Sequence, residues 1–182
     1  MLLPIQQPRS ASRLHPWHGL MICLMVFASP LTWALDSDRN QPLEINADSA
    51  EMNEGEGFSI YSGNVVITQG SIKIEASTIK ITFDDNGVKT MLATEEVDGL
   101  AYMRQQFEPN EDGENDLMEA WGKSINYQVT NEYLTLLGNA KLIQRGNQFS
   151  GEKILFDIPK DNVKASGGED KRVKMIFLPK SN

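Results

Sequence analysis

Hydrophobic and polar residues alternate along most of the chain after residue 40. In the stretch 72–83, apolar residues stand at every second position on either side of Ser77-Thr78, and the residues between them include Lys73, Glu75 and Lys80. Alternation with a period of two is the pattern of a β-strand with one buried face. The same pattern occurs at 43–47, 58–60, 65–67, 101–103, 125–129, 134–136, 140–142, 154–158, 163–165 and 173–177.

These segments predict a chain that is nearly all β. Strands of five or six residues would fit about fourteen to sixteen times into the available length. No segment has a helical period apart from one turn at 93–97. Since each strand has one apolar face, those faces must be buried against each other, as they are when two antiparallel sheets form a sandwich or jelly roll.

One pattern occurs twice with a fixed offset. Gly63-Asn64-Val65-x-Ile67 returns as Gly138-Asn139-Ala140-x-Leu142, and small residues, Ala47 and Gly122, stand sixteen positions before each Gly-Asn pair. Similarity at a fixed period indicates one structural unit built twice. We therefore expect two similar β halves. The least regular region, 84–116, lies between them, and we expect it to form a hairpin at Asn86-Gly87 followed by a long loop.

The leader, residues 1–34, has the layout of a cleaved signal peptide. Arg9 and Arg13 precede an apolar run of nine residues, 20–28, and the small residues of Thr32-Trp33-Ala34 follow. A run of nine is too short to cross roughly 30 Å of hydrocarbon. The remaining residues, 35–182, are predicted to form a single domain. The only cysteine, Cys23, lies in the leader, so disulfides are not expected to stabilise that domain.

The charge of the chain limits its partners. The formal net charge is −8, and removal of the leader with its two arginines would make it −10. Such a balance argues against nucleic acid as a partner. It also argues against a broad cationic platform for lipid phosphates, so binding of an anionic lipid would have to come from its hydrocarbon.

A catalytic or metal site is not expected. Both histidines lie in the leader, and no Gly-x-Ser-x-Gly motif is present, so we predict that the protein is not an enzyme and needs no cofactor. The run Glu108-x-Asn110-x-Asp112-Gly113 with Glu119 has the spacing of a calcium loop. The glutamate at its first position and Pro109 argue against this interpretation, and we favour a solvated loop without metal.

The aromatic residues suggest two uses of the interior. Phe58, Phe83, Tyr127, Tyr133, Phe149, Phe156 and Phe177 all fall in or beside the alternating segments. Each one alone is best explained as ordinary core. A uniformly apolar space between two sheets could also hold a hydrocarbon ligand, because burial of a twelve-carbon chain is worth up to roughly 10 kcal/mol.

The first and last strands are candidate edges. The segment 173–178 contains one charge, Lys174, among apolar residues that include Val173, Met175 and Phe177. Exposed strand edges are normally blocked by charge, so an apolar edge indicates coverage or addition to another sheet. Head-to-tail pairing of such edges would give open chains of subunits.

Several segments resemble the LptA/OstA family of periplasmic lipopolysaccharide-transport bridge proteins. They are 41–45, 62–74, Leu137-Gly138-Asn139-Ala140, Gly151-Glu152-Lys153-Ile154 and Lys171-Arg172-Val173. The resemblance covers about residues 38–180. It implies a twisted, open-ended β-jelly roll of antiparallel strands that stacks end to end in the periplasm, between the inner and outer membranes.

The resemblance also implies a ligand and partners. Lipopolysaccharide would pass along the interior, with the acyl chains of its lipid A inside. Lipid contacts would fall at Leu43, Ile45, Met103, Tyr127 and Val129, and Ile125 lies on the same predicted strand face as Tyr127. The inner-membrane transport complex would dock at the amino-terminal edge and the outer-membrane translocon at the carboxyl-terminal edge. A structural adaptor that binds protein edges without lipid is the alternative.

Overall fold

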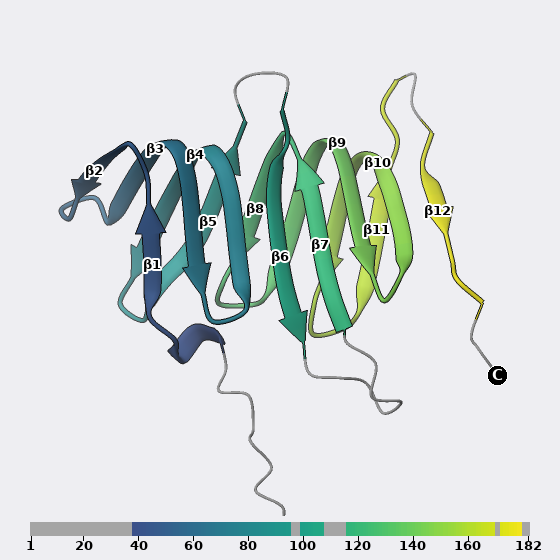
Figure 1. Ribbon diagram of the computed structural model, residues 1–182, viewed down its shortest axis with the longest axis horizontal. Coiled ribbons are helices and arrows are strands. Elements are labelled where there is room, and N and C mark those ends of the chain that lie inside the picture. Colours follow the sequence, from purple (N-terminus) through teal and green to yellow (C-terminus); the bar gives the residue numbers. More distant parts are fainter. Residues whose placement is uncertain (1–37, 96–98, 108–115, 170–171, 180–182) are drawn as a thin grey trace, which may run out of the picture. The chain divides into compact units, whose positions relative to one another are not determined.

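Twelve antiparallel strands make up almost all of the described structure, which confirms the all-β prediction (Figure 1). The computed structural model describes residues 38–95, 99–107, 116–169 and 172–179. The predicted signal peptide, residues 1–34, lies outside these residues. So do residues 108–115, which make up most of the segment with the spacing of a calcium loop. The elements are η1 (Asp38–Asn40), β1 (Leu43–Asn46), β2 (Ser49–Asn53), β3 (Phe58–Gln69), β4 (Ile72–Asp84), β5 (Gly87–Thr94), β6 (Ala101–Phe107), β7 (Asp116–Gly122), β8 (Ser124–Gln128), β9 (Tyr133–Gln144), β10 (Asn147–Asp157), β11 (Asn162–Ser166) and β12 (Lys174–Ile176).

Four strands are about twice as long as the sequence pattern indicated, so the expectation of fourteen to sixteen short strands was wrong. Strands β3, β4, β9 and β10 have between 11 and 13 residues. Each pairs with different neighbours at its two ends: β3 pairs with β2 through residues 58–62 and with β1 through residues 66–69. A long strand that changes partners in this way belongs to two sheets.

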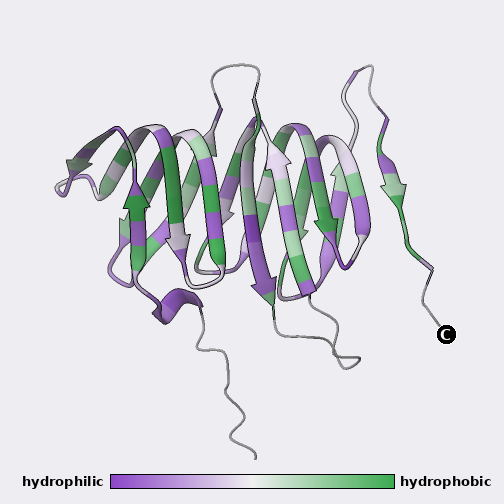
Figure 2. Cartoon of the chain, viewed as in Figure 1, coloured by the Kyte–Doolittle hydropathy of each residue, from purple (hydrophilic) through white to green (hydrophobic). Residues whose placement is uncertain are grey.

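The chain therefore forms two facing sheets that share four strands. The first sheet, in front in Figure 1, contains β1, β6, β7, β12 and one end of each long strand; the second contains β2, β5, β8, β11 and the other ends. Figure 2 shows hydrophobic and hydrophilic residues alternating along the strands, as the period of two requires.

The described backbone passes from one sheet to the other along one side, which we call the crossing side. There the long strands bend, at Gly63-Asn64 in β3 and at Gly138-Asn139 in β9, where all four residues have positive φ. The pairing register shifts at both places, as it does at a β-bulge. The opposite side, which we call the turn side, carries the turns that join strands of the same sheet, such as Arg145-Gly146.

The strand boundaries confirm the predicted repeat, because corresponding strands of the two halves begin at equivalent positions. Strands β2, β3 and β5 begin at Ser49, Phe58 and Gly87, and β8, β9 and β11 begin at the corresponding positions of the second half, Ser124, Tyr133 and Asn162. The pairing is also repeated, because β3 pairs with β1, β2 and β4 just as β9 pairs with β7, β8 and β10. The two halves join through the pairs β5–β8 and β6–β7.

Some local predictions were wrong. At the beginning of β3 the inward positions are Ser59 and Tyr61, so Phe58 and Ile60 face outward. The Lys80 ammonium lies 4.4 Å from the Phe58 ring centroid. Phe83 is also exposed. The register explains this: Ser59 pairs directly with the buried Ile81, which fixes the inward face of β3.

The region 84–116 is more regular than expected. Strands β5 and β6 occupy much of it, and Ala93, assigned to a helical turn, is a buried β5 residue. The hairpin at Asn86-Gly87 is confirmed, because Asp84 pairs with Gly87. Within the described residues there is no helix of the length and apolarity needed to span a membrane.

Candidate functional site

The space between the sheets is lined almost entirely by apolar side chains. Of the predicted lipid contacts, Met103, Ile125, Tyr127 and Val129 are buried. Leu43 and Ile45 are partly buried and pack against the same cluster from the edge strand β1. These residues come from both sheets: β1 and β6 supply three of them, and β8 with the residue after it supplies the others. All six line one interior.

Sequence reasoning missed part of this lining. Met91 in β5 and Met118 and Ala120 in β7 are almost completely buried. The repeat could have identified the last two, since they are the counterparts of Leu43 and Ile45 in the second half. Together with Met103, the interior holds three methionines, whose flexible thioether side chains can repack around different shapes.

Polar groups in the interior gather near the turn side. Gln69 and Gln144, which are related by the repeat, are buried at the last inward positions of β3 and β9. Asp116 at the start of β7 is buried beside the β9–β10 turn. The interior is thus apolar in its middle and polar along one rim.

Two arginines bridge the sheets at this rim. Arg39 of η1 donates a hydrogen bond of 2.8 Å to Glu132 and one of 3.4 Å to the carbonyl of Thr130, both in the β8–β9 turn of the second sheet. The carboxylate of Asp38 holds η1 on the first sheet, accepting hydrogen bonds from the backbone and hydroxyl of Ser71 at 2.7 and 2.8 Å. The turn side is therefore closed by side-chain contacts, whereas continuous backbone closes the crossing side.

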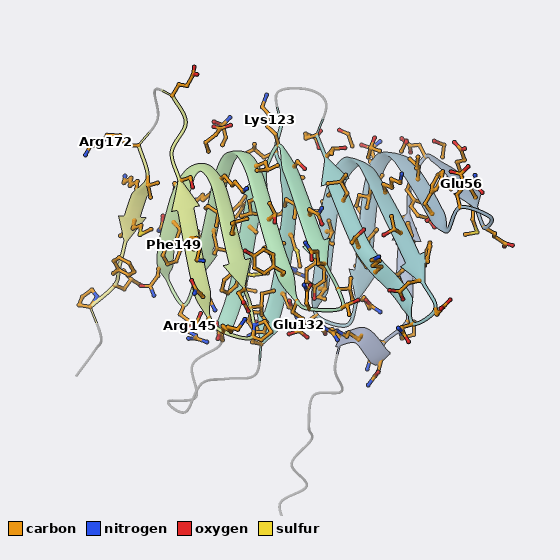
Figure 3. The ribbon with its side chains drawn as sticks, turned by 180° about the vertical axis from the view of Figure 1, so that it is seen from behind. Glu56, Lys123, Glu132, Arg145, Phe149 and Arg172 are labelled. Carbon is orange, nitrogen blue, oxygen red and sulfur yellow. The ribbon has the colours of Figure 1, made fainter. Side chains whose placement is uncertain are left out.

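Arg145 forms the second bridge, from the β9–β10 turn of the first sheet. Its Nε donates to Asp116 at 2.7 Å and its Nη1 donates to Asp161, in the β10–β11 turn of the second sheet, at 2.9 Å. The hydrogen bond with Asp116 is the main cause that raises the pKa of Arg145. Figure 3 shows Arg145 and Glu132 on the same side of the sheets, with Lys123 on the opposite side.

Tyr127 is buried in the interior, near the ion pair between Arg39 and Glu132. Burial, with a contribution from the negative charge of Glu132, raises the pKa of its hydroxyl to about 12. A phenol kept neutral in this way is compatible with an apolar interior. Tyr127 therefore presents an uncharged aromatic surface to the space between the sheets.

Both ends of the interior expose apolar inner faces. At the amino-terminal end, Met52 pairs with the inward Ser59, yet its side chain is 62% exposed. At the carboxyl-terminal end, Met175 pairs with Phe149 and is 42% exposed, and Phe177 is 64% exposed. The ring of Phe177 meets that of Phe149 edge-on at 5.8 Å. Of the predicted edge residues, Val173 is half-buried.

The described residues contain no cluster of three histidine, cysteine or acidic side chains that could hold a metal ion. Glu119, the last position of the calcium-like spacing, lies in the middle of β7 and accepts a hydrogen bond of 2.8 Å from the hydroxyl of Tyr102. Its carboxylate is therefore engaged in a cross-strand contact.

An apolar interior between two antiparallel sheets with exposed ends defines the chain as an open-ended β-jelly roll. Residues 44–162 match the family model described as LptA/(LptD N-terminal domain) LPS transport protein. The lipopolysaccharide export system protein LptH of Pseudomonas aeruginosa is 37% identical over 159 residues, which cover 84% of this chain and 87% of that protein. LptA of Haemophilus influenzae is 31% identical over 160 residues, covering 88% and 90%.

The structural comparison agrees with the sequence comparison. The crystal structure of LptH, described as the LptA-homologous periplasmic component of the lipopolysaccharide transport device of Pseudomonas aeruginosa, matches with a TM-score of 0.68 and 35% identity. The match covers 79% of this chain and all of that chain. The chain belongs to the LptA family of lipopolysaccharide transport proteins.

Proposed function

We propose that this protein carries lipopolysaccharide through the periplasm, with the acyl chains of lipid A held between the two sheets. The observation that carries the proposal is the apolar lining contributed by both sheets, in a member of a lipopolysaccharide transport family. Burial of each methylene is worth about 0.8 kcal/mol, so several acyl chains supply ample binding energy without a cationic platform.

Lipid entry requires the interior to adapt. The inward side chains are almost completely buried against one another in the described structure. An acyl chain therefore enters when the sheets part or when Met91, Met103 and Met118 repack. Parting is favoured at the turn side, because among the described residues only side chains join the sheets there, whereas the crossing side is held by backbone.

End-to-end stacking follows from the exposed ends. The apolar inner faces around Met52 at one end and around Met175 and Phe177 at the other would be covered by a second copy placed head to tail. Such stacking would join the interiors into one path. The inner-membrane transport complex would dock at the amino-terminal end, at β1 and β2, and the outer-membrane translocon at the carboxyl-terminal end. The protein would act without catalysis, since residues 35–182 contain neither histidine nor cysteine.

Photo-crosslinking tests the lipid path. A photoreactive residue at Tyr127, on the inner face, is expected to crosslink purified lipopolysaccharide. The same residue at Lys80, on the outer face over Phe58, is the control and is expected not to crosslink. Absence of a crosslink at Tyr127 in a folded protein would contradict the proposal. In that case the exposed strand β12 would favour the adaptor that binds protein edges without lipid.

A further inference from the structure

The β9–β10 turn contains an arginine in an unfavourable backbone conformation. Arg145 and Gly146 form the two-residue turn, with φ values of 47° and 73°. Turns of this geometry favour Asn, Asp or Gly at the first position, because a side chain at positive φ is strained. Gly70 stands at the equivalent position of the first half, with φ of 57°. A strained residue kept in place by its contacts points to a role for its side chain.

The two contacts of the guanidinium differ in exposure. Asp116 is only 5% exposed, so it is a buried anchor for Nε. Asp161 is 51% exposed and Arg145 itself 46%, so the contact between Nη1 and Asp161 is open to solvent. Exposed ion pairs are weak because water competes for both partners. The guanidinium is thus fixed by one carboxylate, while its other edge can exchange ligands.

That exchangeable edge borders a pocket with one apolar wall. The pocket has a volume of about 480 Å³ and lies at the carboxyl-terminal end, where Phe149, Val163, Met175 and Phe177 form its apolar wall. The rest of its lining is polar: Gln144, Arg145, Asn147, Lys160, Asp161 and Asn162. Lys160 is paired with Asp157 at 2.7 Å. Phe149 and Val163 also pack against the interior cluster. Figure 3 shows Phe149 and Arg145 close together at this end. The pocket therefore combines a polar rim that carries Arg145 with an apolar wall continuous with the interior.

We propose that this pocket binds the phosphorylated sugar of lipid A, with Arg145 as the phosphate ligand. The inference rests on the proposed lipid path and adds a site for the head of the lipid. The phosphate takes the place of the Asp161 carboxylate on Nη1, since guanidinium groups bind phosphate with strong, directed hydrogen bonds. Asp116 keeps the guanidinium in position, and the acyl chains lie along Phe149 and Val163 toward the interior.

Two substitutions in the same ion pair should have opposite effects. Arg145→Gly removes the phosphate ligand and suits the positive φ, and it is expected to weaken binding of phosphorylated lipid A by about tenfold, the scale of one charge-assisted hydrogen bond. Asp161→Asn removes the competing carboxylate and is expected to strengthen binding several-fold. Arg104→Ala is the control, because it removes the same charge from an exposed position of β6 that does not line the pocket, and no change is expected.

Binding is measured from crosslinking at Tyr127 against lipid concentration, at protein concentrations where light scattering gives a monomer. Each variant is titrated with bisphosphorylated and with dephosphorylated lipid A. The expected effects occur with the phosphorylated lipid and disappear with the dephosphorylated one. Arg145→Gly leaves Asp116 buried without its cation, so the double variant Arg145→Gly/Asp116→Asn is measured as well and is expected to bind as weakly as the single variant.

Three results would overturn the inference. One is an effect of Arg145→Gly that is equal for both lipids, because this would assign Arg145 a role in holding the sheets together. Another is weakening by Asp161→Asn. The third is a change in self-association without a change in lipid binding, because this would assign the pocket to a second copy. If the protein that carries the photoreactive residue at Tyr127, and no other substitution, fails to crosslink, the proposed function itself is contradicted.

Discussion

The backbone N–H of Lys123 donates a hydrogen bond of 2.9 Å to the carbonyl oxygen of Gly138. At the corresponding place in the first half, Asp48 makes the same contact with Gly63 at 3.0 Å. Both contacts lie on the crossing side, where the connection before the second strand of each half approaches the bulge in the third. Strands β3 and β9 can enter both sheets because a Gly-Asn pair at positive φ provides the bend in each.

Substitution of the bulge glycine should therefore destabilise the fold. A Cβ on Gly138 would lie 2.9 Å from the Cβ of Lys123, at a φ of 73°. We expect Gly138→Ala to lower the free energy of unfolding by about 1–3 kcal/mol. Urea denaturation measures the change. Gly55→Ala is the matched control, because its Cβ would make only an ordinary contact at 3.6 Å, and equal losses in the two variants would contradict the role of the bulge.

The buried hydroxyl of Ser59 offers a second test. Its Oγ has no hydrogen-bond partner among the described residues, although the side chain is fully buried beside Ile81. A buried polar group without a partner costs about 1–3 kcal/mol. Ser59→Ala is expected to leave stability unchanged or to raise it by up to about 1 kcal/mol, measured by thermal and urea unfolding. A marked loss of stability would mean that the hydroxyl is satisfied.

A charge at the interior should block lipid. Ile45 faces inward from β1 and is partly buried, so Ile45→Glu is expected to fold while placing a carboxylate against the acyl chains. We expect about tenfold less lipopolysaccharide crosslinked at Tyr127. Glu44→Ala, on the outward face of the same strand, is the control and should crosslink as the wild type does. Undiminished crosslinking in folded Ile45→Glu would argue against a path past β1.

Removal of the carboxyl-terminal edge should abolish stacking. The intact protein is expected to form larger oligomers as its concentration rises, and deletion of the residues after Lys171 is expected to leave a monomer. This deletion removes β12 together with the exposed Met175 and Phe177. Light scattering over a concentration series measures the effect. A monodisperse monomer at high concentration in the intact protein would refute the bridge.

The burial of Tyr127 should make the free energy of unfolding fall at alkaline pH. Its pKa is raised to about 12 in the folded protein from an ordinary value of 10.0, so at pH above 10 the unfolded state loses its proton first. The resulting stabilisation is fully present below pH 10 and disappears as the pH rises to about 12, a loss of about 2–3 kcal/mol.

The matching variant is Tyr127→Phe, which cannot ionise. Between pH 8 and 12 its free energy of unfolding should fall less than that of the wild type, by about that amount. Urea denaturation at each pH measures the difference. Parallel pH profiles for the two proteins would contradict the burial of this hydroxyl.

The sequence predicted the fold class well because the signals of alternation and repetition are local. The inward positions of β8, of β9 on either side of its bulge, and of β4 as far as Ile81 were predicted correctly from every second residue. The errors fell where a strand lacks apolar residues or lies at an edge. Strand β2, Ser49–Asn53, gave no signal because every residue but the last is exposed. Phe58 was misplaced because aromatic residues also occur on outward faces, where they pack beneath a lysine.

Part of the candidate site was likewise predicted from the sequence, and part was missed. Alternation and family resemblance together identified Met103, Ile125 and Tyr127 as inward residues, and the structure places them inside. The arginine bridges were missed because their partners are distant in the chain: Arg39 and Glu132 are 93 residues apart. No spacing rule relates such residues, and their proximity depends on how the two sheets face each other.

The sequence by itself determined most of the strand positions, the repeat and the apolar character of the interior, because each of these follows from the order of residues along one strand and its copy. Only the tertiary structure decided which side of the jelly roll is held by backbone and which by side chains. That division depends on where the long strands cross between the sheets and on which turns then meet across the rim, and the pairing of distant strands sets both.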